Sequence, residues 1–118
     1  MRIALCNEVI APMPFPQQCV YAAKLGYDGL EIAPYTLSDE PHRMGGAQIA
    51  AARAAAADAG IAVTGLHWLL LKPAGLSISS RDENIRKKTC AAQAGICIQY
   101  SFEQNSCFDF AFQENFCL

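Results

Sequence analysis

A glycine that ends a helix recurs in this sequence after one strand-and-helix unit. Gly26 follows the helical segment 17–25, and Gly60, 34 residues later, follows the alanine-dense segment 48–59. A short apolar segment comes soon after each glycine, at residues 29–33 and 61–67. Glycine adopts the left-handed conformation that closes many helices, and strands alternating with helices of this length form parallel sheets. The repeat therefore predicts an α/β fold made of β/α units.

Three such units fit within residues 1–89. The first strand is expected to begin at Arg2–Leu5, and the prolines at 14–16 predict the start of the first helix. The third strand, 61–67, is followed by Ser80-Arg81-Asp82-Glu83. This segment has the S-x-x-E form of a capping box, in which the two side chains satisfy each other's backbone N–H groups. A third helix is therefore expected to start at Ser80.

The segment after the first strand distinguishes two ways of arranging these units. The glycine fingerprints that bind phosphate in many open sheets are absent there, and Cys6-Asn7-Glu8 stands in their place. This favours a closed TIM barrel. Such a barrel typically needs about 250 residues, so the 118 residues hold an incomplete barrel of three units. A fourth strand is one further interpretation, because Ile96, Ile98, Tyr100 and Phe102 alternate along the chain.

The composition changes abruptly after Thr89. All nine Lys and Arg lie at or before Lys88, whereas residues 90–118 hold four of the six Cys and five of the six Phe. We therefore divide the chain into residues 1–89, the N-terminal part of the barrel, and a divergent tail, residues 90–118. An out-of-frame or spliced-on ending explains this tail best, and a buried, aromatic-rich terminal element is the alternative.

The charge balance bears on the partners of the chain. A net charge of −2 gives no general attraction to nucleic acid or anionic lipid. No signal peptide and no apolar run long enough to span a bilayer are recognisable, which predicts a cytoplasmic protein. The six cysteines include no Cys-x-x-Cys pair, so free thiols are expected.

Candidate site residues stand at the carboxyl ends of the predicted strands, where parallel β/α folds bind their ligands. They are Asn7 and Glu8 after the first strand, Glu31 in the second, and His67 with Trp68 after the third. We expect all five to bind substrate.

Each candidate also has a structural interpretation. Glu31 can simply pair with Arg2 or Arg43, His67 can be a core imidazole, and Trp68 can be a packing residue. For the two residues after the first strand, the alternative is a strand that ends one residue earlier or later. His42, in a polar loop, is expected to be solvated.

Glu31 and His67 have side chains able to bind one metal ion or one sugar. Two groups do not complete a metal site, which generally needs three protein ligands. The sequence contains neither G-x-S-x-G nor H-E-x-x-H, so acyl transfer and zincin-type proteolysis are not supported.

Two segments, 22–32 and 57–67, resemble the xylose-isomerase-like TIM-barrel superfamily, and in particular its sugar phosphate isomerases and epimerases. The stretch Gly65–Trp68 resembles the end of that family's third strand, and residues 73–77 and 82–89 resemble the loop and helix that follow. The resemblance covers residues 1–89.

The resemblance implies a divalent metal ion (Mn, Mg, Co or Zn) that holds sugar oxygens while carboxylates move a proton next to the carbonyl. It places the catalytic residues and most metal ligands on later strands, which this chain lacks, and leaves Glu31, His67 and Trp68 in the substrate shell.

Two alternatives accompany this reading. His67 resembles a zinc ligand of the related apurinic-site endonucleases, which gives a metal-dependent nuclease as the second function. The third is a non-catalytic fragment that associates through its open sheet edge. We expect the 118-residue chain alone to be inactive, with the isomerase or epimerase function belonging to its lineage.

Overall fold

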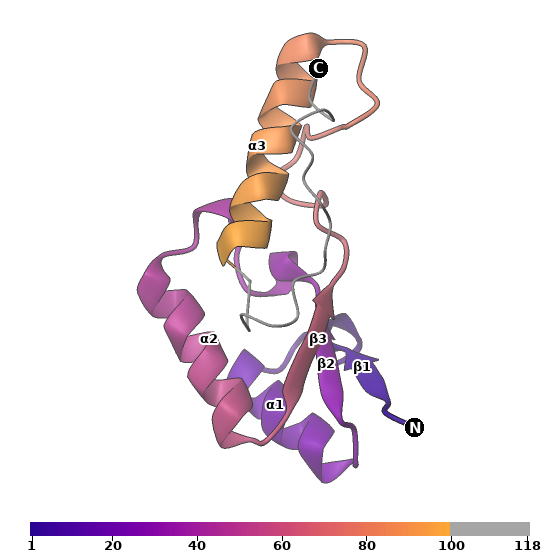
Figure 1. The fold of residues 1–118 in the computed structure, drawn as a ribbon, viewed down its shortest axis with the longest axis vertical. Coiled ribbons are helices and arrows are strands. Elements are labelled where there is room, and N and C mark those ends of the chain that lie inside the picture. The colour runs from indigo at the N-terminus through magenta and orange to yellow at the C-terminus, as the bar shows by residue number, and fades with distance from the viewer. Residues whose placement is uncertain (100–118) are drawn as a thin grey trace.

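A computed structural model of the chain describes residues 1–99, which form a three-stranded parallel sheet and three α-helices (Figure 1). The elements alternate along the chain as β1 (Ala4–Cys6), α1 (Phe15–Lys24), β2 (Gly29–Ile32), α2 (Gly46–Asp58), β3 (Ala62–Leu66) and α3 (Glu83–Gln99). Short 3-10 helices η1 (Asn7–Ile10), η2 (Pro34–Thr36) and η3 (Pro41–Arg43) follow the first two strands. The strand order is β1-β2-β3. The predicted α/β fold with parallel strands is confirmed, and no helix in this part of the chain is long and apolar enough to cross a membrane.

Prolines and glycines lie at the helix ends, as predicted from the sequence. Pro14 directly precedes α1, and Pro16 is in its first turn, where a missing backbone N–H costs little. Gly26 and Gly60 have φ angles of 84° and 66°, in the left-handed region, and each lies shortly after the end of its helix. These glycines turn the chain back toward the sheet.

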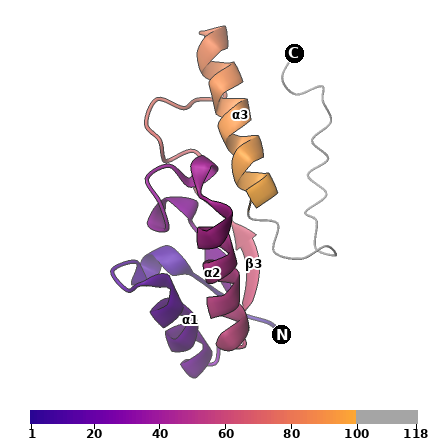
Figure 2. The same ribbon diagram turned by 90° about the vertical axis from the view of Figure 1, so that its left-hand side faces the viewer.

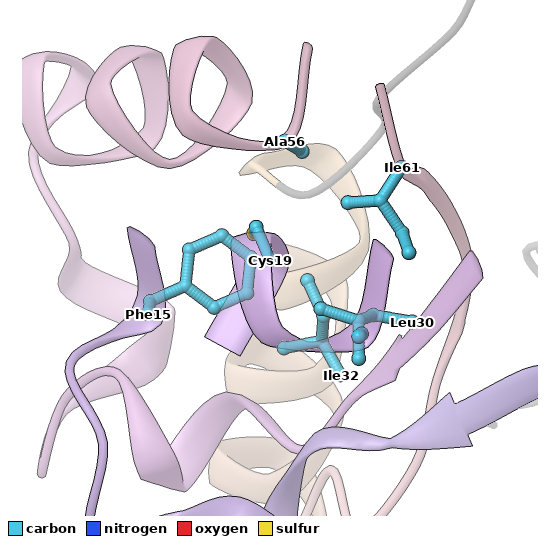
Figure 3. Packing of buried hydrophobic residues seen from close by; sticks show 7 residues of the cluster. Phe15, Cys19, Leu30, Ile32, Ala56 and Ile61 are labelled. Carbon is cyan, nitrogen blue, oxygen red and sulfur yellow. The ribbon is translucent and has the colours of Figure 1, made fainter. Parts of the chain in front are cut away.

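Helices α1 and α2 cover the same face of the sheet, as both ribbon views show (Figures 1 and 2). Leu30 and Ile32 of β2 are completely buried beneath them. Burial of each such side chain contributes about 1.5–3 kcal/mol to folding. Figure 3 shows these two residues facing other side chains of the core, among them Phe15, Cys19, Ala56 and Ile61. Burial raises the pKa of Cys19 to about 11, so its protonated thiol packs as an apolar group.

A β-bulge in β3 decides which side chains face this core. Leu30 pairs with Val63 but Glu31 pairs with Gly65, so Thr64 is an extra residue. Side chains alternate between the two faces of a strand, and one extra residue reverses the alternation after it. Val63 and Leu66 therefore both pack against the core, and the residue after Leu66 faces the opposite side of the sheet.

Gly29 makes room for this bulge. A β-carbon at Gly29 would lie 2.4 Å from the Cγ2 methyl of Thr64 and 3.0 Å from the carbonyl oxygen of Ala62. The Thr64 hydroxyl also donates a hydrogen bond to the Leu30 carbonyl, at 3.2 Å. Thr64 thus fills the space that a side chain at position 29 would need.

Helix α3 lies beyond the carboxyl end of β3 in both ribbon views, and its main contact is with η3 (Figures 1 and 2). Its Ile96 is completely buried against Met44 and Ile49. Gly95 allows the close approach, since a β-carbon there would lie 3.1 Å from the His42 carbonyl oxygen. His42 is half-buried in this contact, so the expectation of a solvated loop histidine is wrong.

Two expectations for this region need correction. Ile96 and Ile98 belong to α3 and not to a fourth strand, because Glu83–Gln99 is one continuous helix that passes through the change in composition at Thr89. Tyr100 and Phe102, the other two residues of the expected strand, lie outside the described residues.

The capping box at Ser80 is also wrong. The helix begins three residues later, where the Asp82 carboxylate accepts the Asn84 N–H at 2.8 Å in an N-cap arrangement. The Ser80 hydroxyl accepts the Asp82 N–H instead, and Glu83 pairs with Lys87 one turn along the helix. Asp82 is thus better placed to cap the helix, and Ser80 stabilises the turn before it.

We predict that Gly29→Ala lowers the free energy of unfolding by about 1–3 kcal/mol, the usual cost of overpacking a close contact. Urea denaturation measures this change. Gly29→Ala combined with Thr64→Ser should recover part of the loss, because serine lacks the clashing methyl and keeps the hydroxyl. The control is Gly46→Ala in α2, where a β-carbon has no neighbour within 4 Å; equal losses at positions 29 and 46 would contradict the explanation.

Candidate functional site

Three side chains meet at the carboxyl ends of the three strands, on the face that the helices leave uncovered. Cys6 ends β1, Glu31 lies in β2, and His67 follows β3. Their ligand atoms all lie within 4.8 Å of one another. Cys6 pairs with Glu31 in the sheet register, and the His67 N–H donates to the Ile32 carbonyl at 3.0 Å. Backbone pairing therefore holds all three residues in place.

The imidazole of His67 lies between two carboxylates. Its Nε2 is 3.4 Å from Oε2 of Glu8, and its Nδ1 is 3.8 Å from Oε2 of Glu31. Both ring nitrogens are buried, and neither makes a hydrogen bond within residues 1–99. The carboxylates are more open, with side-chain exposures of 29% for Glu8 and 41% for Glu31, against 18% for His67. The structure thus brings together three of the predicted residues, with the carboxylates nearer to solvent.

Glu8 is held in this position by a residue that the sequence analysis missed. The Tyr35 hydroxyl, from η2, donates a hydrogen bond to Oε2 of Glu8 at 3.2 Å. Desolvation, together with this hydrogen bond to a carboxylate, raises the pKa of Tyr35. Tyr35 lies just after β2, so the rule that sites form at strand ends extends to it.

Cys6 was also missed as a site residue. Its thiol donates to Oε2 of Glu31 at 3.4 Å. Burial, reinforced by this hydrogen bond and the negative charge of Glu31, raises the pKa of Cys6. The available signal was the alternation of β1, in which Leu5 packs toward the core and Cys6 falls on the opposite face. Cys6, Cys19, Cys90 and Cys97 are free thiols, as expected for these four.

Asn7 lies beneath the site and braces it. It is completely buried. Its amide nitrogen donates to Gln18 at 3.0 Å and to Thr36 at 2.8 Å, while its amide oxygen accepts the Ala33 N–H at 2.8 Å. Both amide hydrogens are therefore used inside the protein. Asn7, predicted to bind substrate, instead connects η1, α1 and the end of β2.

Trp68 directly follows His67 and ends the strand in an unusual conformation. Its φ angle is 55°, in the left-handed region that a bulky residue adopts only at a cost of about 1–3 kcal/mol. The residue is 57% exposed, so packing does not offset this cost fully. Trp68 is thus an exposed aromatic residue directly after His67 of the cluster.

The contacts of Glu31 and His67 differ from the structural roles that the sequence also allows for them. Arg43 pairs with Glu40 at 3.5 Å, whereas Glu31 has Cys6 and His67 beside it. His67 is not a hydrogen-bonded core histidine, because its ring nitrogens have no hydrogen-bond partner in the described part of the chain. Both residues thus belong to one polar cluster rather than to separate structural contacts.

The donor set of this cluster bears on the divalent metal ion that the resemblance implies. Mg²⁺ and Mn²⁺ favour oxygen ligands, while Zn²⁺ and Co²⁺ also accept sulfur and imidazole nitrogen. Cys6, Glu31 and His67 offer one sulfur, one oxygen and one nitrogen. These residues fit the softer pair of ions.

No protein-family model, curated protein or solved structure matches this chain. The class of protein defined by fold and site is therefore a parallel β/α protein with a Cys, Glu and His cluster at its strand ends.

We predict that Asn7→Ala lowers the free energy of unfolding by about 2–4 kcal/mol, because it leaves several buried polar groups without partners. Thr36→Val removes one branch of the same network and should cost less, about 1 kcal/mol. Chemical denaturation with urea gives both values. An Asn7→Ala variant as stable as the parent chain would rule out the bracing role.

Trp68→Asn should leave stability unchanged or raise it by about 1 kcal/mol, since asparagine tolerates the left-handed conformation better than other non-glycine residues. Trp68→Ala removes the same indole without that tolerance and is the matched control. The two midpoints of urea denaturation are compared. If the asparagine variant were the less stable of the two, strain at this position would not be the cause.

Proposed function

We propose that this chain belongs to the lineage of barrel-type sugar isomerases and epimerases, and that its strand-end cluster binds a small sugar or sugar phosphate. The observation that carries the proposal is the meeting of Glu8, Glu31 and His67 at the ends of successive parallel strands. Ligand sites of parallel β/α folds lie at these carboxyl ends of the strands. The three-stranded sheet with helices on one face is compatible with the opening units of such a barrel.

The exposed groups of the cluster suit the recognition of a sugar. The carboxylates of Glu31 and Glu8 are 41% and 29% exposed and can accept hydrogen bonds from hydroxyl groups. Hydrogen bonds to charged acceptors are among the stronger ones. The exposed indole of Trp68 adds a flat apolar surface for the C–H groups of a sugar ring.

His67 lies between the two carboxylates and is less exposed than either of them. Its ring nitrogens are buried, so in this arrangement they do not reach a substrate directly. Its ring nitrogens lie 3.4 Å from Oε2 of Glu8 and 3.8 Å from Oε2 of Glu31, so the imidazole fills the space between the two carboxylates. We therefore assign His67 a positioning role and assign hydroxyl binding to the carboxylates.

The proton transfer itself is assigned by resemblance to groups on later strands of a complete barrel. A divalent metal ion, when bound, would polarise the substrate carbonyl as a Lewis acid. The residues of β1, β2 and β3 then bind and orient the sugar.

Fluorescence of Trp68, the single tryptophan of the chain, tests sugar binding. We expect a saturable change in emission with at least one member of a panel of aldoses, ketoses and their phosphate esters. Glu31→Gln should weaken that affinity by roughly 10–100-fold, the value of a hydrogen bond to a charged group. Glu40→Gln, at an exposed carboxylate outside the cluster, is the matched control.

The same titration separates the alternative functions. Binding and cleavage of a duplex containing an abasic site, without sugar binding, would favour the nuclease. A panel in which no sugar gives a saturable change, or in which Glu31→Gln binds like the parent chain, would remove support for the isomerase lineage.

A further inference from the structure

We propose that Cys6, Glu31 and His67 form a binding site for a zinc-type divalent cation. The ligands are the Cys6 thiolate, one carboxylate oxygen of Glu31 and Nδ1 of His67, and Glu8 orients the imidazole. The proposal stands on the geometry of the cluster and does not require that the chain bind a sugar.

The two donor separations that involve Glu31 are close to those around a tetrahedral ion. With Zn–S near 2.3 Å and Zn–O and Zn–N near 2.0 Å, a tetrahedral site separates sulfur from oxygen by about 3.5 Å and nitrogen from oxygen by about 3.3 Å. Here Sγ of Cys6 is 3.4 Å from Oε2 of Glu31, and that oxygen is 3.8 Å from Nδ1 of His67. The third separation, between sulfur and nitrogen, is within 4.8 Å, and its shortening as the side chains close on the ion completes the geometry.

The unsatisfied imidazole is the second, independent observation. Buried polar atoms are nearly always hydrogen-bonded, so two ring nitrogens without a hydrogen bond in residues 1–99 call for an explanation. A cation on Nδ1 satisfies the first nitrogen. Nε2 then carries the proton and faces Oε2 of Glu8 at 3.4 Å.

Glu8 and Tyr35 complete an outer shell of the kind found around zinc-bound histidines. Such histidines usually donate their second N–H to a carboxylate, which orients the ring and raises its basicity. Glu8 is in position to accept that hydrogen, and the Tyr35 hydroxyl holds Glu8 from the other side at 3.2 Å. Tyr35 thus positions Glu8, and Glu8 orients the imidazole so that Nδ1 of His67 faces the other two ligands.

Binding is a proton-coupled step. The Cys6 thiol loses its proton to solvent as the sulfur–metal bond forms, and no electron is transferred. Three protein ligands leave the fourth position of a tetrahedral ion open, which is the pattern of catalytic rather than structural zinc sites. Water, or an oxygen of a bound ligand, can take that position.

Cobalt(II) is the probe, because tetrahedral Co²⁺ bound to a thiolate gives visible bands and a near-ultraviolet charge-transfer band. The parent for the titration is the full chain with serine at Cys90, Cys97, Cys107 and Cys117, which leaves Cys6 and the buried Cys19. We expect one Co²⁺ per chain, with a charge-transfer band that one equivalent of Zn²⁺ removes. No sugar is added, so this result is independent of the proposed function.

Single substitutions in that parent identify the ligands. Cys6→Ser should abolish the charge-transfer band. Glu31→Gln and His67→Gln should each weaken Co²⁺ binding by more than the roughly 10–100-fold expected for Glu8→Gln, the usual cost of losing an outer-shell partner. Glu40→Gln and His42→Gln are the matched controls and should bind like the parent.

Circular dichroism and urea denaturation without metal show which variants fold. Cys6→Ser changes one atom, so it remains informative even where His67→Gln fails to fold. A charge-transfer band that persists in Cys6→Ser, no spectral change in the parent, or equal affinity for His67→Gln and His42→Gln would each overturn the proposal.

Discussion

The contact between Gly29 and Thr64 is the constraint on which the candidate site depends. Because position 29 has no side chain, Thr64 can occupy the space above it as an extra residue in β3. The bulge reverses the alternation of the strand, so that Leu66 packs into the core. His67 thereby faces Glu31 on the other side of the sheet. One missing side chain thus determines the direction in which the imidazole points.

A second constraint operates through buried hydrogen bonds. Asn7 connects η1 to α1 through Gln18, to the end of β2 through Ala33 and to η2 through Thr36. Glu8 is the next residue in the chain, so its carboxylate is positioned by the same connections. A fully satisfied buried network is rigid, because any movement leaves polar groups without partners. The bulge therefore orients the imidazole, and the amide network positions one of the two carboxylates beside it.

The sequence predicted those parts of the fold that depend on local chemistry. Proline restricts the backbone angles and glycine extends their range, so both residues mark helix ends. The carboxyl ends of parallel strands lie together, which led to the prediction that Glu31 and His67 share one site. Parts that depend on packing between distant segments were missed. The thiol of Cys6 joins the cluster through the sheet register, and Tyr35 reaches Glu8 from a neighbouring loop. Ile96 lies in a helix and packs on Met44, just after η3, and on Ile49 of α2, contacts that alternation along the chain does not reveal.

The bulge also makes the orientation of His67 depend on the number of residues in β3. In most strands, a change of one residue is absorbed in the adjoining loops. Here, regular pairing of the same residues without the bulge would bring Leu66 to the face of the polar cluster and turn His67 toward the core. Relatives of this chain that keep the histidine beside the cluster should therefore have either one residue between the apolar positions equivalent to Val63 and Leu66, or two residues there together with a glycine at the position of Gly29. A larger residue at that position next to a two-residue spacing would mark chains that have lost the cluster.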